Sequence, residues 1–187
     1  MGGVYVHIPF CVRKCAYCDF VSYPALDIES IAPAYLDSAL AELRLRQDEL
    51  HCVTPVRTLY IGGGTPTCVP AGLLAAFIAQ LIGAVCAEAG MLIEVTCEAN
   101  PKTVDRATLA ELRRAGVNRL SLGFQSLADA ELAALGRIHS ATDCLRAYAD
   151  ARGAGFDNIS IDLILGAPGQ TRDTLERTIT SVVRLGP

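Results

Sequence analysis

The sequence lacks the features that send proteins to membranes, to secretion or to nucleic acids. No apolar run reaches the roughly 18 residues of a membrane span. The first ten residues have no basic leader, His7 and Pro9 interrupt their apolar run, and Val6 stands where a myristoylation signal has Ser or Thr. The 16 Lys and Arg are spread among 20 Asp and Glu, which leaves no basic cluster for nucleic acid. We therefore expect a cytoplasmic protein with reduced thiols and no transmembrane segment.

Length and composition suit a single folded unit. The chain has 187 residues, of which 51% are hydrophobic. This is enough for one core of ordinary size. We expect residues 1–187 to form one domain, with no second domain in this chain.

A strand-like run followed by a helical run recurs five times along the chain. The strand-like runs are VYVHI, VRTLYI, LIEVTCE, RLSLGFQ and NISIDLIL. The helical periodicity covers 28–50, 71–89, 103–115, 127–135 with 141–153, and 172–185. Ser126, Ser140 and Thr171 occupy N-cap positions. Such long crossovers predict parallel strands and an α/β fold.

The expected strands are apolar on one face and polar on the other. The apolar positions are Val4, Val6, Ile8, Leu59, Ile61, Ile93, Val95, Cys97, Leu120, Leu122, Phe124, Ile159, Ile161 and Leu163. The polar positions are Tyr5, His7, Thr58, Tyr60, Glu94, Thr96, Glu98, Ser121, Gly123, Gln125, Asn158, Ser160 and Asp162. A polar face is costly against a helix layer but suits the lumen of a barrel. A doubly wound open sheet is the alternative.

Five strand-helix units do not close an ordinary barrel. A parallel edge would be left unpaired where the sequence stops. We expect this chain to be the N-terminal part of a longer protein. An open barrel completed by another chain is the alternative.

Three cysteines lie within eight residues, at Cys11, Cys15 and Cys18. Their spacing lets three thiolates converge on one inorganic centre, and Arg13 and Lys14 favour the deprotonated form. A zinc site that adds His7 is one interpretation, and a metal-free structural loop is another. A 4Fe-4S cluster fits the number better, because three thiolates leave one iron open to a small molecule.

The remaining cysteines are single and lie in apolar surroundings. They are expected to be small buried side chains: Cys52, Cys68, Cys86, Cys97 and Cys144.

The stretch CVRKCAYC resembles the radical S-adenosylmethionine signature, in which the amino and carboxylate groups of S-adenosylmethionine chelate the open iron. Further stretches are similar to the oxygen-independent coproporphyrinogen oxidase group, which includes HemW-like heme chaperones. These are YVHIPFC, YIGGGTPT, EANP, LSLGFQS, RIHS and SIDLILGAPGQT. The resemblance runs from Tyr5 to Gln170. It implies a partial barrel of the six-unit radical SAM type, of which five units are present.

The resemblance also implies a set of site residues and partners. In the oxidases, the matching positions contact one or two S-adenosylmethionines: Tyr5, Tyr17, Gly63, Gly64, Thr65, Glu98, Gln125, Arg137 and Asp162. A reduced cluster passes an electron to the sulfonium, and the resulting 5'-deoxyadenosyl radical abstracts hydrogen. The implied partners are a reduced flavodoxin or ferredoxin-type electron donor, heme or a porphyrin, and a heme-acceptor protein.

Several of these residues are also site candidates by chemistry and position. Glu98, Gln125 and Asp162 lie near the C-terminal ends of expected strands, where barrels of this kind carry their chemistry. The glycines after the second strand match neither nucleotide motif, because no Gly-Lys-Ser/Thr follows and Thr67 replaces a required glycine. They form either a plain turn or a close approach to a ligand. Arg137 is either a carboxylate-binding cation or a solvated helix end.

One position departs from the oxidase pattern. The oxidases have a further cysteine two residues after the third, where this chain has Phe20. This favours the heme chaperone branch over the oxidase that converts coproporphyrinogen III to protoporphyrinogen IX. A zinc-stapled binding module is the third hypothesis.

Overall fold

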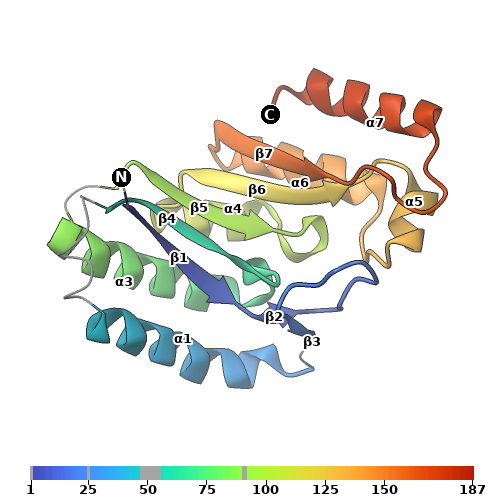
Figure 1. Ribbon diagram of the computed structural model, residues 1–187. Helices are drawn as coiled ribbons and strands as arrows, with labels where there is room; N and C mark the ends of the chain where they lie inside the picture. The colour runs from blue at the N-terminus through green and yellow to red at the C-terminus, as the bar shows by residue number, and fades with distance from the viewer. Residues whose placement is uncertain (1, 25, 47–55, 90–91) are drawn as a thin grey trace.

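The computed structural model describes residues 2–24, 26–46, 56–89 and 92–187. Its centre is a five-stranded parallel sheet in the order β1-β4-β5-β6-β7 (Figure 1). These strands are Gly2–Ile8 (β1), Val56–Gly63 (β4), Glu94–Ala99 (β5), Arg119–Gln125 (β6) and Asn158–Leu163 (β7). Two short strands, Phe10–Cys11 (β2) and Tyr23–Pro24 (β3), pair with each other beside this sheet. The expected parallel α/β fold is confirmed.

The helices follow the strands in turn. They are α1 (Ile28–Leu45), α3 (Ala71–Ala89), α4 (Arg106–Arg114), α5 (Asp129–Ala134), α6 (Ala141–Gly153) and α7 (Arg172–Leu185), with 3-10 turns at Pro66–Cys68 (η1) and Pro101–Thr103 (η2). In the part of the chain that the structure describes, no helix is both long and apolar enough to cross a bilayer.

The strand order separates the two folds that the sequence left open. Each strand pairs with the next long strand of the chain, so right-handed crossovers place the helices on the same face. Helix α3 contacts α1 and α4, and α4 contacts α6. Figure 1 shows this layer below and behind the sheet. A doubly wound sheet would reverse its strand order, so that alternative is wrong, and the strand order is that of a partial barrel.

The core lies between the sheet and this helix layer. Nine of the expected apolar strand positions are buried there: Ile8, Leu59, Ile61, Val95, Cys97, Leu120, Leu122, Phe124 and Ile159. Burial of each large apolar side chain contributes about 1.5–3 kcal/mol. The prediction that Ile93 belongs to the apolar face is wrong, because β5 begins one residue later and the Ile93 side chain is 61% exposed. The other face of the sheet therefore remains available for a polar site.

The helix starts agree with the sequence in part. Ser140 and Thr171 cap α6 and α7, each in a capping box. The expected cap at Ser126 is wrong, because α5 begins at Asp129 and the Ser126 hydroxyl donates to the Glu131 carboxylate at 2.6 Å. The buried carboxylate thus uses the hydroxyl that would have capped the helix.

Two helix boundaries also differ from the expected ones. The helix expected over 103–115 begins at Arg106 with Asp105 as its N-cap, because the Asn100 side chain closes the preceding η2 turn. The helix expected over 28–50 is described to Leu45, and residues 47–50 lie outside the described residues.

Candidate functional site

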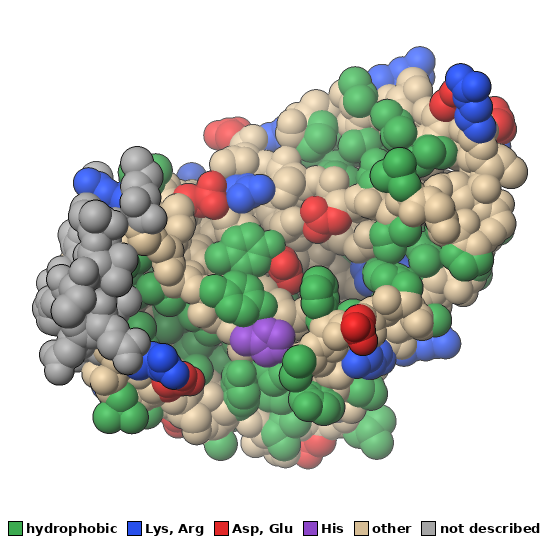
Figure 2. Space-filling model, in the orientation of Figure 1, with side chains coloured by type: hydrophobic (Ala, Val, Ile, Leu, Met, Phe, Trp, Pro, Cys, Tyr) green, Lys and Arg blue, Asp and Glu red, His purple; other side chains and the backbone are tan. Residues whose placement is uncertain are grey.

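A cavity of about 420 Å³ opens at the C-terminal ends of the parallel strands. Its lining residues are Cys11, Arg13, Lys14, Cys15, Tyr17, Cys18, Phe20, Ser22, Tyr60, Gly63, Gly64, Thr65, Glu98, Ala99, Asn100, Ser121, Gly123, Gln125, Arg137, Asp162 and Ile164. Figure 2 shows a hollow on this face with acidic and basic side chains around it. The cavity therefore contains all three clustered cysteines and eight of the nine positions that the resemblance implied.

Each strand brings a different part of the cavity wall. The cysteine loop follows β1, the glycine run ends β4, and Glu98 lies near the end of β5. Parallel pairing sets Glu98 level with Ser121 and Gly123 level with Asp162. Because parallel strands end at one edge of the sheet, residues far apart in sequence meet there. Glu98, Gln125 and Asp162, expected near strand ends, thus line one cavity.

The glycine run lets the cysteine loop approach β4. A Cβ atom at Gly64 would lie 2.5 Å from the Phe10 carbonyl oxygen and 3.0 Å from Cys11 Sγ. The backbone N–H groups of Gly64 and Thr65 donate to Ile8 O and Phe10 O, both at 2.8 Å. Only glycine permits this close backbone packing, so the run is more than a plain turn.

Glu98 is held at the floor of the cavity by two donors. Tyr60 donates to Oε1 at 2.7 Å and the Gly63 backbone N–H donates to Oε2 at 3.1 Å. Burial raises the pKa of Glu98, while the hydrogen bonds from Tyr60 and Gly63 oppose that rise. A carboxylate fixed in this way is oriented to accept further hydrogen bonds from a polar ligand.

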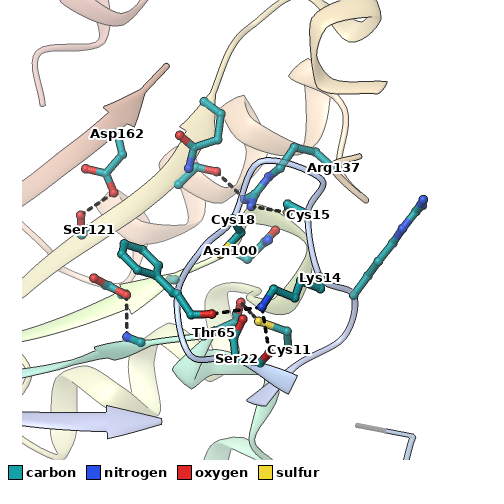
Figure 3. A pocket seen from close by; sticks show the side chains of 18 of the residues that line it. Cys11, Lys14, Cys15, Cys18, Ser22, Thr65, Asn100, Ser121, Arg137 and Asp162 are labelled. Carbon is teal, nitrogen blue, oxygen red and sulfur yellow. Dashed lines mark hydrogen bonds between the residues drawn. The ribbon is translucent and has the colours of Figure 1, made fainter. Parts of the chain in front are cut away.

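The ends of β6 and β7 form the opposite wall. Asp162 accepts a hydrogen bond from the Ser121 hydroxyl at 2.9 Å, which Figure 3 shows (dashed line). Gln125 has a φ of 69°, the only positive value among the described residues that are not glycine. A left-handed residue other than glycine costs free energy, and such residues cluster at functional sites. This backbone bend ends β6 at the cavity.

Arg137 joins this wall to the cysteine loop. Its Nη2 donates to Gly123 O at 2.8 Å, and its Nη1 donates to Cys15 Sγ and to the Tyr17 hydroxyl, both at 3.4 Å. Its Nε is buried and has no hydrogen-bond partner within the described residues. Arg137 is therefore not a solvated helix end, and its unused donor suits an acceptor on a bound ligand.

The three cysteines face one cavity without forming a compact metal site. Among the described residues, no three His, Cys, Asp or Glu side chains are grouped closely enough to hold a metal ion. Cys11 Sγ lies 3.7 Å from the Thr65 hydroxyl, and Cys15 accepts from Arg137. The donor set of three free thiols on one loop fits an iron-sulfur cluster chemically, and the side chains must turn toward each other to hold it.

Lys14 fixes the shape of the cysteine loop. Its ammonium group donates to the carbonyl oxygens of Phe20 at 3.2 Å and Ser22 at 3.5 Å. The backbone N–H of Ala16 donates to Leu135 O at 3.3 Å, which ties the loop to the end of α5. The loop is therefore closed across Cys15 and Cys18 by Lys14 and tied to the end of α5 between these two cysteines.

Two predicted site residues, His7 and Tyr5, lie next to lining residues but do not line the cavity themselves. The His7 ring lies 2.9 Å from the Tyr5 hydroxyl through Nδ1 and 2.7 Å from Val21 O through Nε2, and His7 does not line the cavity. Its ring nitrogens are thus occupied, which argues against a zinc site of three cysteines and this histidine. The Tyr5 ring stacks on the Tyr60 ring with 6.0 Å between the ring centroids, and Tyr5 is also absent from the cavity lining.

Two buried polar groups behind the cavity were not singled out from the sequence. His139 is 4% exposed and lies 3.1 Å from both Asn100 Oδ1 and Phe124 O. Glu131 is 2% exposed and accepts from Ser126 and, at 3.0 Å, from Gln170. These contacts join the loops that follow β5, β6 and β7. The polar residues in the stretches RIHS and LSLGFQS were the sequence signal that could have identified these buried groups.

The isolated cysteines behave largely as expected. Cys97 and Cys144 are buried, while Cys68 and Cys86 are partly buried; Cys52 lies outside the described residues. Burial raises the pKa of Cys97 and of Cys144 to about 12. The cysteines in the described segments form no disulfide with one another.

The chain matches a protein-family model and is similar to curated proteins. The model of the radical SAM superfamily matches residues 5–182. Heme chaperone HemW of Mycobacterium tuberculosis is 37% identical over 185 residues, which are 98% of this chain and 47% of that protein. HemW of Escherichia coli is 35% identical over 186 residues, 99% of this chain and 48% of that protein. The chain spans about half the length of these curated relatives.

Solved structures give the same result for the fold. Coproporphyrinogen III oxidase (HemN) from Escherichia coli, described as a radical SAM enzyme, superposes with a TM-score of 0.84 and 30% identity. The match covers 99% of this chain and 42% of that one. The radical S-adenosylmethionine methyltransferase TsrM from Kitasatospora setae has a TM-score of 0.68 at 15% identity, which shows similarity of fold alone.

Proposed function

Since this chain belongs to the radical SAM superfamily, we propose that it binds a 4Fe-4S cluster and S-adenosylmethionine and acts as the N-terminal half of a HemW-like heme chaperone. Cys11, Cys15 and Cys18 would hold the cluster. When bound, the cluster supplies an iron with an open position and a one-electron donor next to the adenosyl compound. The whole of residues 1–187 would be one domain of a longer cytosolic protein.

The observation that carries this proposal is the shared cavity. Three thiols from one loop, the backbone of the glycine run and the polar ends of three strands line the same space. Glu98 and Asp162 would accept hydrogen bonds from hydroxyl or ammonium groups of S-adenosylmethionine. The free Nε of Arg137 would donate to its carboxylate. The strand ends would thus orient the ligand, and the cysteine loop would cover it from water.

Phe20 favours the chaperone over the oxidase. It lines the cavity at the place where the oxidases have a further cysteine, and it is 66% exposed. An aromatic ring gives the cavity mouth an apolar contact suited to a flat tetrapyrrole and removes a thiol from that position. We therefore assign heme as the cargo, to be passed to an acceptor protein. The family resemblance adds a reduced flavodoxin or ferredoxin as the electron donor.

Anaerobic reconstitution with iron and sulfide tests the cluster. The full chain should take up about four iron and four sulfide ions and show a cluster absorption band and an electron paramagnetic resonance signal after reduction. A variant with all three cysteines changed to serine should take up neither, while Cys144→Ser should load normally. Zinc without sulfide in the wild-type chain would contradict the proposal.

A second assay separates chaperone from oxidase. The loaded protein should bind about one heme per chain, followed by its absorption spectrum, and should leave coproporphyrinogen III unchanged under reducing anaerobic conditions with S-adenosylmethionine. Decarboxylation of coproporphyrinogen III would instead assign the oxidase reaction.

A further inference from the structure

A hydroxyl group in the cavity wall has no hydrogen-bond partner. Ser22 lines the same cavity as the three cysteines, and it is 3% exposed. Among the buried side-chain nitrogen and oxygen atoms of the described residues, only Ser22 Oγ and Arg137 Nε have no hydrogen-bond partner, and both residues line this cavity. A buried hydroxyl that has lost its water is costly unless a ligand or ordered water supplies the missing bond. The two unpartnered groups therefore both indicate a ligand in this cavity.

The loop around Ser22 is fixed at two points. The Lys14 ammonium group donates to the Ser22 carbonyl oxygen at 3.5 Å. On the other side, the Tyr23 backbone N–H donates to Pro9 O at 2.8 Å, and Tyr23 pairs with Phe10 in the β2–β3 ladder. These contacts hold the backbone of Ser22 in the cavity wall. Its hydroxyl therefore lacks a partner because of how this loop is folded.

Ser22 belongs to the part of the cavity wall that the cysteine loop and the β2–β3 pair form, and not to the strand ends. Strand pairing sets Cys11 opposite Pro24, two residues after Ser22, and Figure 3 draws Ser22 on the same side of the cavity as Cys11 and Thr65. Glu98 and Asp162 belong to the strand ends that form other parts of the wall. Ser22 thus lies in the same part of the wall as Cys11.

We propose that the Ser22 hydroxyl donates a hydrogen bond to a sulfur of the iron-sulfur cluster, either the Cys11 thiolate or an inorganic sulfide. This assignment rests on the proposed function. Donors to cluster sulfur stabilise the more negative, reduced form and so raise the reduction potential. Ser22 then contacts the cluster directly and sets how readily it accepts an electron.

Ser22→Ala in the full chain separates an effect on the fold, measured without the cluster, from an effect on the cluster itself. Without it, the thermal midpoint should stay unchanged or rise, because the substitution removes an unsatisfied hydroxyl. With it, the ratio of reduced to oxidised cluster at a fixed potential should fall about tenfold, which corresponds to about 59 mV for a one-electron couple. A redox titration followed by electron paramagnetic resonance measures this ratio.

Two variants control for other effects of the substitution. Ser22→Thr keeps a hydroxyl and should keep the reduction potential of the wild type. Ser38→Ala removes a hydroxyl that donates to Ala34 O on the exposed side of α1, and it should change neither the potential nor the iron content.

The possible results are distinct. A loaded wild-type chain whose Ser22→Ala variant has an unshifted potential overturns this assignment and leaves the proposed function intact. An unshifted potential with weaker S-adenosylmethionine binding also overturns it, because the hydroxyl then serves the adenosyl compound. A lower thermal midpoint of the cluster-free variant means a structural hydroxyl and likewise overturns it. A wild-type chain that takes up no iron and sulfide overturns the proposed function itself.

Discussion

Arg137 and Cys15 are 122 positions apart in the sequence, yet Nη1 of the arginine donates to the cysteine sulfur at 3.4 Å. The loop before α6 therefore contacts the cysteine loop directly. The same guanidinium also donates to Gly123 O, at the end of β6. A single side chain thus links the strand ends to the proposed cluster ligands.

Replacement of Arg137 should weaken S-adenosylmethionine binding. Arg137→Gln removes the cation whose Nε has no partner in the described residues and which we assign to the ligand carboxylate. Loss of a hydrogen bond to a charged group costs about 1.5–3 kcal/mol, so the dissociation constant should rise about 10- to 100-fold. Calorimetric titration of the reconstituted protein measures this. Arg172→Gln on the exposed side of α7 is the control, and equal affinities would contradict the assignment.

Gly64→Ala should destabilise the fold around the cysteine loop. The new Cβ would lie 2.5 Å from Phe10 O, which is backbone and has to move. We expect a loss of about 2 kcal/mol in the free energy of unfolding. Gly83→Ala is the matched control, because nothing lies within 4 Å of its Cβ and it is an exposed position of α3. That control should gain about 0.5–1 kcal/mol. Denaturant titration of both variants checks the contrast in sign.

Glu131→Gln should also destabilise the protein. The carboxylate accepts from the hydroxyls of Ser126 and Thr174 and from the Gln170 amide. Burial raises the pKa of Glu131, but these hydrogen bonds outweigh that effect and lower it. A glutamine side chain brings a donor into a site of donors, so the free energy of unfolding should fall by about 2–3 kcal/mol. Glu176→Gln, in an exposed ion pair on α7, should change it by less than about 0.5 kcal/mol.

His139 should make stability depend on pH between 6.5 and 4. Burial, followed by the nearby Arg137 charge, lowers the pKa of His139 from 6.5 to about 4. The unfolded chain therefore binds a proton as the pH falls through 6.5, while the folded chain binds it only near pH 4. This contribution to stability is present above pH 6.5 and is lost progressively down to pH 4.

The pH dependence is tested by comparison with His139→Gln. Between pH 6.5 and pH 4 the wild-type free energy of unfolding should fall by about 2 kcal/mol more than that of the variant, once solvent screening is included. Denaturant titrations across this range give both curves. Parallel curves would mean that His139 is not titrating in this window.

The sequence predicted the parts of the fold that depend on local pattern. Alternating apolar residues identified the buried face of β4 and β6, and capping residues placed the starts of α6 and α7. The position of polar residues near strand ends was enough to bring Glu98, Gln125 and Asp162 into one cavity. These predictions succeeded because period and capping are properties of short segments.

Features that depend on tertiary contact were missed. Nothing near Ser126 in the sequence shows that its hydroxyl binds Glu131 instead of capping a helix. The exposure of Ile93 depends on where β5 begins to pair, and the isolation of the Ser22 hydroxyl depends on the loop around it. Such partners become visible only when the chain is folded.

The site is modular because each long strand lies beside the next long strand of the chain. Every strand-helix unit supplies its own segment of the rim, and a few rim side chains such as Arg137 bridge two units. A substitution at a rim position outside these bridges can therefore change how one part of a ligand is held while the remaining contacts keep their places. The architecture allows ligand preference to change one unit at a time.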